Sequence, residues 1–467
     1  SPADDDTASP PSNLSRGDCN PLEEATEPSI ELFARTDTDQ GADGPLLLIE
    51  IIDGILHEDR YWAVGQGGLM SFDLSGDAPR LDDTFGGIAG RFYRLLLVDH
   101  STPLIYATHR DQGLTVVDRS DPYDLREVHT LMTDGLGGLV QKGDRIYATK
   151  HDGSIVVFDI SNPTEPTLVS TTEAPGHPWN AITIGDTLYT ADNSDGIGVF
   201  SLNEPESPSY QGHIDIGSGA LDLTHQGSLI FVAAGSGGLL VIETDTPSEA
   251  TEIARVRTGT PIIDVSVSET TAWVVDHESV WAIDISEPSN PFVIGRAETP
   301  RFSMTVAADG NEAWVGDWTA VGGYRAHRDK TRSTIVAYPD TVRMPSESTK
   351  ATIELNNLGP INGQIIQWNS IEENAEAFTS DTAIMPNGSQ NITIEWPLNT
   401  EFGQVCIQTD DPTTPALDIA VMRTDHDLSV PLGAAAPDFE LTSLDGERFR
   451  LSEQLGHPVL LVYFATW

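Results

Sequence analysis

The chain has 467 residues, enough for two to four domains of ordinary size, and a formal net charge of −47, from 25 Lys and Arg against 72 Asp and Glu. Nucleic acids and anionic lipids are bound mainly by cations that meet phosphates, so a surface this acidic excludes both as partners. No stretch approaches the ~18 consecutive apolar residues of a membrane-spanning helix, and we expect no transmembrane segment. The acidity suits a protein that stays soluble in saline surroundings, or one that collects cations.

Residues 1–30 are rich in Asp, Glu, Ser and Pro, and this composition predicts an acidic disordered tether. The sequence starts at Ser1 without a charged-then-apolar leader, so we expect either a removed signal segment or a fragment. Two cysteines are too few for a disulfide scaffold. We interpret Cys19 as a free thiol and Cys406 as a small buried residue of a strand, and a bridge between them is the alternative.

Residues 37–44 weakly resemble a calcium-binding loop, with Asp37, Asp39 and Asp43 as the candidate ligands. The spacing departs from the Asp-x-Asp-x-Asp-Gly pattern, and no bidentate Glu occupies the twelfth position. A solvated linker is the alternative interpretation. Calcium is the one cofactor that the sequence suggests.

One phrase recurs through residues 31–335: an aromatic strand, a turn with a glycine, a second apolar strand, and an acidic or polar residue at its end. The first two copies occupy residues 60–73 and 104–118. The end residues lie 45, 41, 42, 42 and 41 residues apart and are Asp73, Asp118, Asp159, Ser201, Glu243 and Asp284. A degenerate seventh copy occupies residues 312–324. A constant period of this length is typical of propellers and other repeat folds.

Each copy alternates with period two, and its β-branched and aromatic residues lie between Gly, Asp, Asn and Pro, which predicts short strands joined by turns. The phrases Ile-Ser-Asn-Pro-Thr-Glu-Pro (residues 160–166) and Ile-Ser-Glu-Pro-Ser-Asn-Pro (residues 285–291) follow an end residue. They are predicted turns, because two prolines do not fit a central strand. About four strands in each copy predict a seven-bladed β-propeller over residues 31–335.

These phrases resemble the LVIVD-type repeat of bacterial surface and secreted propeller proteins, in which a strand ends in Asp and Ile-Ser-x-Pro-x-x-Pro follows. The resemblance extends over most of residues 31–335. The resemblance implies a β-propeller fold and an envelope or secreted location. It leaves the ligand open, because this family is defined by its fold.

The repeat stops near Arg332, and residues 336–430 show clear alternation with regular turn signals. The predicted strands are residues 350–355, 364–368, 391–396 and 403–409. An antiparallel sandwich of about 100 residues with this pattern is immunoglobulin-like. The turn phrases at residues 355–359 and 409–415 resemble those of bacterial immunoglobulin-like spacer domains on envelope proteins, which implies a spacer or contact role.

Residues 434–467 contain Ala-Ala-Pro-Asp-Phe-Glu-Leu (residues 435–441) and Pro-Val-Leu-Leu-Val-Tyr-Phe-Ala-Thr-Trp (residues 458–467). They resemble the opening of the thioredoxin-like redoxins, which include thiol peroxidases and periplasmic thiol–disulfide oxidoreductases. In that family Phe-Ala-Thr-Trp is followed by Cys-x-x-Cys at a helix start, where the thiolate is favoured. The resemblance implies an incomplete α/β segment whose active-site cysteines would lie beyond Trp467.

In a propeller, the turns between the second and third strands of each blade open on one face. Several of these turns carry side chains that can bind a cation or a polar ligand. They are His109, Arg110, Lys150, His151, Asp192, Asp195, Asp276, His277, Asp317 and Trp318. The alternative interpretation is structural, because Asp, Asn and Gly are the residues that tight turns require.

The entrances of the innermost strands lie on the same face and surround the axis. Alignment of the copies puts four polar residues at equivalent positions there, with three larger residues beside them. The four are Arg94, Asn180, Asp222 and Asp264, and the three are Tyr93, Trp179 and Arg301. Aromatic and charged side chains that converge on a channel mouth are typical of a ligand pocket. The alternative is that the mouth is wet and polar, as in any propeller.

The sequence thus favours a mainly β protein: a seven-bladed β-propeller, an immunoglobulin-like sandwich and an incomplete thioredoxin-like α/β segment. It contains no catalytic constellation with geometric support. We expect a monomeric, extracytoplasmic scaffold (periplasmic, cell-surface or secreted) that binds a protein or carbohydrate on one propeller face. The alternative is a fragment of a thiol–disulfide oxidoreductase or thiol peroxidase, in which the propeller serves as a docking module.

Overall fold

The computed structural model describes most of the chain between residues 12 and 450. The described residues are 12–14, 30–37, 50–86, 92–98, 102–109, 112–193, 196–244, 250–327, 333–339, 341–345, 347–370, 372, 374–411, 416–424, 440–442 and 448–450. Their regular structure consists of β-strands, so the prediction of a mainly β protein is confirmed. Within these ranges no helix is long and apolar enough to cross a bilayer.

Seven four-stranded antiparallel sheets account for the larger part of the described residues. The first is β3 (Ile51–His57), β4 (Arg60–Gly65), β5 (Gly68–Asp73) and β6 (Arg80–Phe85). The second is β7 (Phe92–Val98), β8 (Leu104–His109), β9 (Gly113–Asp118) and β10 (Arg126–Leu131). The third is β11 (Leu136–Lys142), β12 (Arg145–Lys150), β13 (Ser154–Asp159) and β14 (Thr167–Glu173). The fourth is β15 (Pro178–Ile184), β16 (Thr187–Asp192), β17 (Gly196–Ser201) and β18 (Ser209–Ile214).

The remaining three sheets follow the same order, except that the last one takes a strand from the N-terminal region. The fifth is β19 (Asp222–Gln226), β20 (Leu229–Ala233), β21 (Leu239–Glu243) and β22 (Thr251–Val256). The sixth is β23 (Asp264–Ser268), β24 (Thr271–Val275), β25 (Ser279–Asp284) and β26 (Phe292–Glu298). The seventh is β27 (Ser303–Asp309), β28 (Glu312–Asp317), β29 (Ala320–Ala326) and β2 (Ile30–Asp37). The six end residues of the repeat all terminate the third strand of a sheet, as the sequence predicts.

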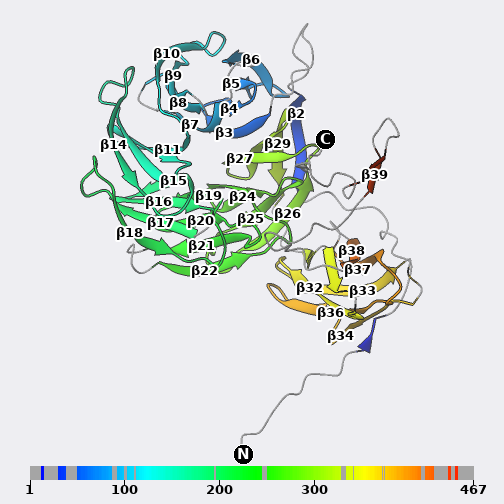
Figure 1. Ribbon diagram of the computed structural model, residues 1–467. Coiled ribbons are helices and arrows are strands. Elements are labelled where there is room, and N and C mark those ends of the chain that lie inside the picture. The colour runs from blue at the N-terminus through cyan, green and yellow to red at the C-terminus, as the bar shows by residue number, and fades with distance from the viewer. Residues whose placement is uncertain are drawn as a thin grey trace, which may run out of the picture.

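A separate hydrophobic cluster lies between each sheet and the next, so the sheets form a closed ring (Figure 1). One cluster joins the seventh sheet to the first, with Trp314 and Tyr61 among its members. The outer strand of the seventh sheet is β2, which pairs with β29. Arg35 of β2 also forms an ion pair of 2.7 Å with the buried Asp317. The ring is therefore closed by two parts of the chain that are far apart in sequence.

The acidic residue that ends a repeat holds the turn that follows. Asp73, Asp159 and Asp284 each accept, through Oδ1, the backbone N–H two residues later, at 2.8–2.9 Å. This is an Asx turn, in which a side chain replaces a backbone acceptor. Hydrogen bonds from Ser75 and Ser161 lower the pKa of Asp73 and Asp159 below the ordinary value. The repeated acid is thus explained by local turn geometry.

Buried tyrosines of the second strand connect neighbouring sheets. Tyr106 Oη donates to the carbonyl of Pro163 at 2.9 Å, and Tyr147 Oη donates to the carbonyl of Pro205 at 2.9 Å. Each proline belongs to the turn after the third strand of the next sheet. The proline phrase of the repeat therefore supplies acceptors for the aromatic residue of the preceding copy.

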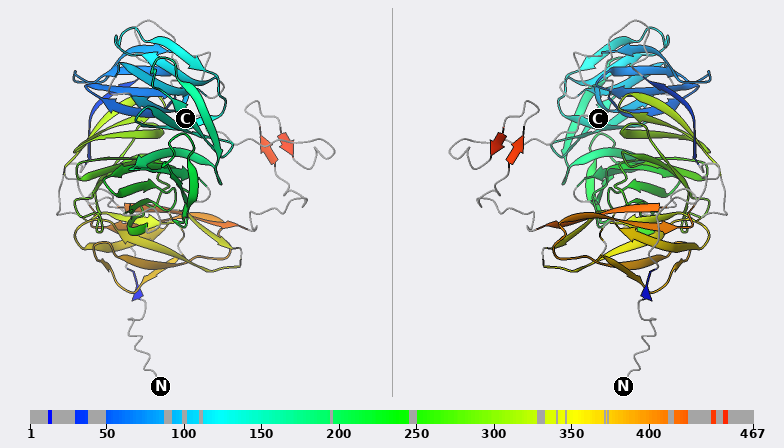
Figure 2. Two further views of the ribbon diagram at one scale, coloured as in Figure 1. Left: turned by 90° about the vertical axis from the view of Figure 1, so that its left-hand side faces the viewer. Right: turned by 90° about the vertical axis from the view of Figure 1, so that its right-hand side faces the viewer.

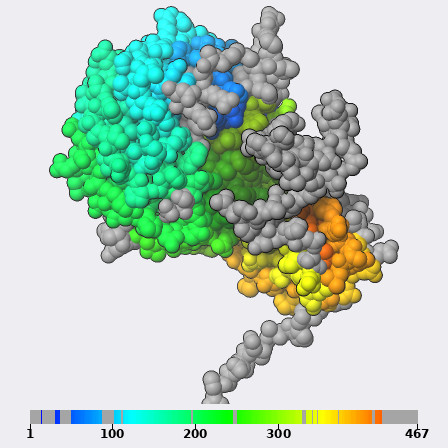
Figure 3. All heavy atoms as spheres, viewed as in Figure 1, coloured from blue at the N-terminus to red at the C-terminus, as the bar shows by residue number. Residues whose placement is uncertain are grey.

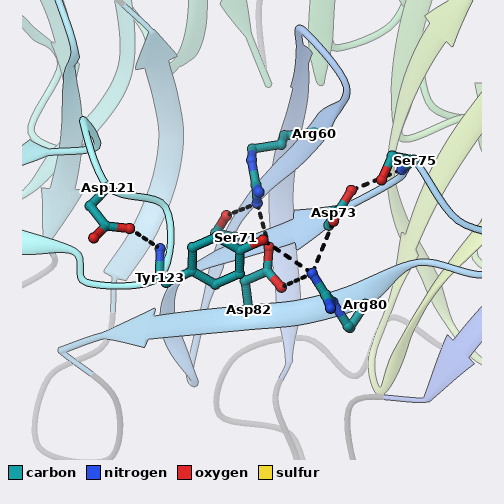
Figure 4. Close-up of polar contacts among 8 residues, drawn as sticks. All are labelled: Arg60, Ser71, Asp73, Ser75, Arg80, Asp82, Asp121 and Tyr123. Carbon is teal, nitrogen blue, oxygen red and sulfur yellow. Dashed lines mark hydrogen bonds and ion pairs between the residues drawn. The ribbon is translucent and has the colours of Figure 1, made fainter.

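The interface between the first and second sheets uses charged groups instead (Figure 4). The ring of Tyr123 lies 5.5 Å from the guanidinium carbon of Arg60 and 5.9 Å from that of Arg80. Arg60 donates to Asp82 at 2.7 Å, and Arg80 donates to Asp73 at 3.0 Å. The turn that carries Tyr123 in the second sheet is thereby held against the first sheet.

Two five-stranded sheets form a sandwich beside the ring. In spatial order, one consists of β1 (Ser12–Asn13), β34 (Glu376–Thr379), β36 (Ser389–Glu395), β32 (Lys350–Asn357) and β30 (Ile335–Tyr338). The other consists of β31 (Thr341–Pro345), β38 (Ala416–Thr424), β37 (Phe402–Thr409), β33 (Gly363–Ser370) and β35 (Ala383–Ile384). One hydrophobic core joins both sheets and includes Trp368 and Trp396. The four strands expected from the sequence lie in β32, β33, β36 and β37.

The N-terminal strand belongs to the sandwich. It pairs with β34, and the Leu14 side chain that follows is buried in the core. The carbonyl of Leu14 accepts a hydrogen bond of 3.1 Å from Trp368 Nε1. The prediction of a disordered tether over residues 1–30 is therefore wrong for residues 12–14, because a distant domain supplies the partners that the local composition lacks. The ring is inserted between two parts of the sandwich.

Direct contacts join the sandwich to the ring. Val336 and Leu358 pack into the hydrophobic cluster between the fifth and sixth sheets. The Val293 N–H donates to the carbonyl of Leu358 at 2.7 Å, and Asn387 Nδ2 donates to Asn290 Oδ1 at 2.8 Å. Figures 2 and 3 show the sandwich, in yellow and orange, against the green part of the ring.

Cys406 of β37 is disulfide-bonded, and the described part of the chain holds no free cysteine. Cys19, the one other cysteine of the sequence, lies outside the described residues. The interpretation of Cys406 as a merely apolar residue is therefore wrong, and its bond agrees with the alternative of a bridge between the two cysteines.

The last strands described are β39 (Glu440–Thr442) and β40 (Arg448–Arg450), which pair antiparallel with each other. The other parts of residues 434–467, including the apolar phrase at residues 458–467, lie outside the described residues. The thioredoxin-like segment therefore stays a prediction from the sequence.

Replacing Tyr147 with Phe removes one buried inter-sheet hydrogen bond and leaves the Pro205 carbonyl without this donor. We expect the free energy of unfolding to fall by about 1 kcal/mol. Urea unfolding followed by tryptophan fluorescence measures this change. Tyr210→Phe, at a tyrosine with 37% of its surface exposed, is the matched control and should unfold as the parent does. Equal stability of Tyr147→Phe and the parent would contradict the assigned role.

The disulfide predicts that thiol titration of the denatured chain finds no reactive thiol before reduction and two after it. Reduction should also lower the melting temperature, because a disulfide restricts the unfolded chain. Two reactive thiols in the unreduced, denatured protein would contradict the bond.

Candidate functional site

A cavity of about 230 Å³ lies at one end of the ring axis, and we call it the mouth cavity. Its wall includes residues from the innermost strands (Asp53, Asn180, Asp222 and Asp264) and from turns between second and third strands (Asn193 and His277). Members of both predicted groups, the turn residues and the residues at the entrances of the innermost strands, therefore line one cavity. Trp179 also lines the cavity, and its ring packs edge-on against His151 at 5.4 Å.

The acids of the mouth cavity are bound to neighbouring sheets. Asp222 Oδ1 accepts a hydrogen bond from Asn180 Nδ2, and Asp222 Oδ2 accepts one from the Val265 N–H at 3.2 Å. Asp264 Oδ2 accepts the Val306 N–H at 2.6 Å. The innermost strand of a sheet has one edge without a neighbouring strand, and its inward N–H groups need acceptors. Each acid satisfies such a group on the next sheet, which is a structural role.

The carboxyl groups of Asp222 and Asp264 lie close enough to share a proton. Burial raises the pKa of Asp222, and burial together with the neighbouring Asp222 charge raises the pKa of Asp264 well above its ordinary value. One carboxyl of the pair therefore stays protonated where free carboxyls are ionised. The mouth cavity is less negative than its count of acids suggests.

A second cavity of about 600 Å³ shares His277 with the mouth cavity, and we call it the aromatic pocket. His277 stacks on Phe302 with ring centres 4.2 Å apart, and Phe302 lies 5.6 Å from Trp318. Burial lowers the pKa of His277, so its imidazole is neutral at pH 7. Arg301 and Glu298 lie at the wall of the pocket and add hydrogen-bonding groups.

Three predicted turn acids are buried, and each is bound by other groups of the propeller. Both oxygens of Asp192 accept the His177 N–H at 3.0 Å. Asp276 accepts the Ser279 N–H at 2.7 Å and Trp281 Nε1 at 2.8 Å. Asp317 forms the ion pair with Arg35 described above. These contacts agree with the structural interpretation of the turn acids.

The basic turn residues are also engaged. Lys150 forms an ion pair of 2.8 Å with Asp152, and His109 is buried, with its Nδ1 accepting the Gln112 N–H at 3.1 Å. Arg110, Asp195, Asp39 and Asp43 lie outside the described residues. Asp37, Tyr93 and Arg94 lie on described strands, at positions whose side chains are not described.

The described residues form no metal site. Within the described residues, no three His, Cys, Asp or Glu side chains lie together so as to hold a metal ion. Calcium at residues 37–43 stays a prediction from the sequence.

Sequence reasoning missed Asp53 and Phe302. Asp53 pairs with Val64 in the first sheet, as Asp264 pairs with Val275 in the sixth, so it occupies the equivalent ring position. The alignment of the copies could have found Asp53, because this equivalent position carries the signal that identified Asp264. Phe302 directly follows Arg301, and only the folded ring brings it onto His277.

The shared proton predicts an unusual pH dependence of stability. A carboxyl whose pKa is raised by folding contributes stability that is full below the pKa of the unfolded chain, about 3.9, and is lost as pH rises through the folded pKa. Asp264→Asn mimics the protonated form at every pH. We expect its melting temperature to match the parent near pH 4 and to exceed it at pH 7.5, by the equivalent of about 1–3 kcal/mol.

Asp77→Asn, at an exposed acid, is the matched control and should follow the parent at both pH values. A melting temperature of Asp264→Asn that does not rise relative to the parent between pH 4 and pH 7.5 would contradict the shared proton.

Comparison with known proteins agrees with this architecture. The family model of the LVIVD repeat matches residues 139–173 and 263–299, within the third and sixth sheets. No curated protein matches the chain. The WD40 β-propeller domain of Doa1 is 12% identical, with 64% of this chain and 97% of that chain covered and a TM-score of 0.50.

Two other solved structures are equally similar. The WD40 repeats of RRP9 are 12% identical, with 64% of this chain and 100% of that chain covered and a TM-score of 0.50. The Pan2 WD40 domain of Neurospora crassa is 13% identical, with 64% and 96% covered and a TM-score of 0.50. At these identities the likeness concerns the fold alone. The ring of sheets is therefore a β-propeller that carries LVIVD repeats.

Proposed function

We propose that this chain is a non-catalytic, extracytoplasmic scaffold whose β-propeller binds a protein or carbohydrate ligand in the aromatic pocket and the adjoining mouth cavity. The observation that carries the proposal is the group of His277, Phe302 and Trp318 around one cavity. Concave sites with aromatic walls and a few polar groups are the usual form of ligand pockets.

The pocket suits a ligand with one apolar face and several hydroxyl, amide or charged groups. The aromatic rings offer a flat apolar surface, and Arg301, Glu298 and Thr299 border it. A sugar ring has these properties, and so does an aromatic or arginine side chain of a protein partner. The acids of the axis take little part in ligand binding in this proposal, because they hold the inner strands.

The architecture that presents this pocket is, in our proposal, a seven-bladed propeller followed by an immunoglobulin-like spacer. Seven four-stranded sheets with a hydrophobic cluster at each junction support the number of blades. The two-sheet sandwich with a single core supports the spacer. Contacts between Val336, Leu358 and the propeller support a sandwich that holds the propeller in one orientation.

The extracytoplasmic location is supported by the disulfide of Cys406, because such bonds persist in oxidising compartments and are rare in reducing ones. The acidic surface supports solubility outside the cell. The oxidoreductase alternative rests on residues 434–467, and the described strands β39 and β40 add no chemistry to it.

Screening the purified chain on an oligosaccharide array and on an array of extracellular protein domains tests the proposal. For the ligand found, we expect Trp318→Ala and Phe302→Ala to weaken binding at least tenfold, about 1.4 kcal/mol or more, because each removes part of the aromatic surface. Titration calorimetry measures the change.

Leu168→Ala, at a side chain with 51% of its surface exposed on the outer strand β14, is the matched control and should bind as the parent does. Ligand binding that is unaffected by both aromatic substitutions would place the ligand elsewhere and contradict the proposed pocket.

A further inference from the structure

Among the described strands, none pairs with half of the edge of β38. The strand β31 pairs in parallel with residues 420–424 of β38 and extends no further. Residues 416–419 pair with β37 on one side, and no backbone hydrogen bond reaches their other side within the described part of the chain. A stretch of about four residues, about 13 Å long, therefore presents a free strand edge.

The gap arises because the chain changes sheets. The strand β30 pairs with β32 in one sheet of the sandwich, and the next strand, β31, pairs with β38 in the other sheet. Before that crossing, β30 runs near β38 without pairing with it. The first half of β38 is thus left without the partner that its second half has.

A cavity of about 330 Å³ lies along this free edge, and we call it the edge cavity. The sandwich contributes residues 334–337 and 416–419 to its wall, and the propeller contributes residues 258–260 and Trp281. Glu278, Arg296 and Glu298 line both the edge cavity and the aromatic pocket. The two cavities are therefore neighbours, and the free edge is reached from the face that carries the aromatic pocket.

The charges around the edge cavity are mainly negative. Glu278, Glu298 and Asp418 are exposed there. The one cation in the wall is Arg296, whose Nε donates to Ser279 Oγ at 2.7 Å and whose guanidinium carbon lies 5.3 Å from the Trp281 ring. A ligand that enters this cavity meets carboxylates without a free cation.

We propose that the free edge of β38 binds an extended, basic segment of a partner protein by strand addition. A polypeptide in β conformation is the ligand that matches a row of backbone donors and acceptors, and alternate side chains of such a segment point to opposite faces. Lysine or arginine at alternate positions would face Glu278, Glu298 and Asp418. The two sites share Glu278, Arg296 and Glu298 at their border, whereas the strand edge and the aromatic rings belong to different residues.

Fluorescence anisotropy with a labelled hexapeptide of alternating lysine and valine tests this proposal on the intact chain at about 0.15 M salt, where long-range charge effects are screened. We expect saturable binding. The same hexapeptide with every backbone amide methylated keeps its charge but cannot pair as a strand, and it should bind at least tenfold more weakly. Equal binding of the two peptides would overturn the proposal and would show attraction by charge alone.

A variant that fills the cavity locates the peptide. Ala416→Trp places a large ring at the free edge and should weaken binding at least tenfold. Leu398→Trp, at an exposed side chain outside the cavity, is the matched control and should bind as the parent does. Unchanged binding by Ala416→Trp, with a melting temperature that shows a folded sandwich, would overturn the proposal. Loss of peptide binding with ligand binding at the aromatic pocket retained would show that the two sites are separate.

Discussion

The pairing of β2 with β29 is the constraint on which the propeller depends. Six sheets are built from consecutive strands, but the seventh would have three strands and a free outer edge without β2. The apolar residues Ile30 and Ala34 of β2 belong to the clusters on both sides of the seventh sheet. Their loss would open the packing toward the sixth sheet and toward the first. Because the mouth cavity takes residues from several sheets, its shape exists only when the ring is closed.

A second constraint operates along the propeller axis, where the inner edge of each innermost strand has no neighbouring strand within its sheet. Hydrophobic residues could fill this space, but they could not satisfy inward-pointing N–H groups. Asp222 and Asp264 do so by accepting hydrogen bonds from Val265 and Val306 of the next sheets. This arrangement places the two carboxyls close together in a buried site, and burial together with the Asp222 charge raises the pKa of Asp264. The aromatic pocket, by contrast, is lined by turn residues such as His277 and Trp318, and Asp222 and Asp264 are not in its wall.

Features that repeat in the sequence were predictable, and features formed by a single distant contact were not. The end residues such as Asp159 marked the third strands because an Asx turn needs an acid at that position in every copy. The turn residue His277 was predictable as part of the open face, whereas its stacking on Phe302 depends on the angle between the sixth and seventh sheets.

The N-terminal segment shows even more clearly that a single distant contact is not predictable from the sequence. Leu14 is one apolar residue in an acidic stretch, and nothing in its neighbourhood indicates that Trp368 is its partner. The disulfide of Cys406 was only the alternative interpretation for the same reason, since no local pattern around Cys406 indicates a partner. The turn acids were ambiguous because the same residue types hold turns and bind ligands. Contacts such as that between Asp276 and Trp281 reveal the structural role.

The insertion of the propeller between two parts of the sandwich has a mechanical consequence. Leu14 and Ile335 belong to the one core of the sandwich, so the chain enters and leaves the propeller from the same folded unit. A pull on the chain before β1 and after β38 loads the sandwich first, at the pairing of β1 with β34. While that pairing holds, the propeller carries no tension and keeps its closed ring and its aromatic pocket. Loss of this pairing would place the β2–β29 pairing in the path of the force.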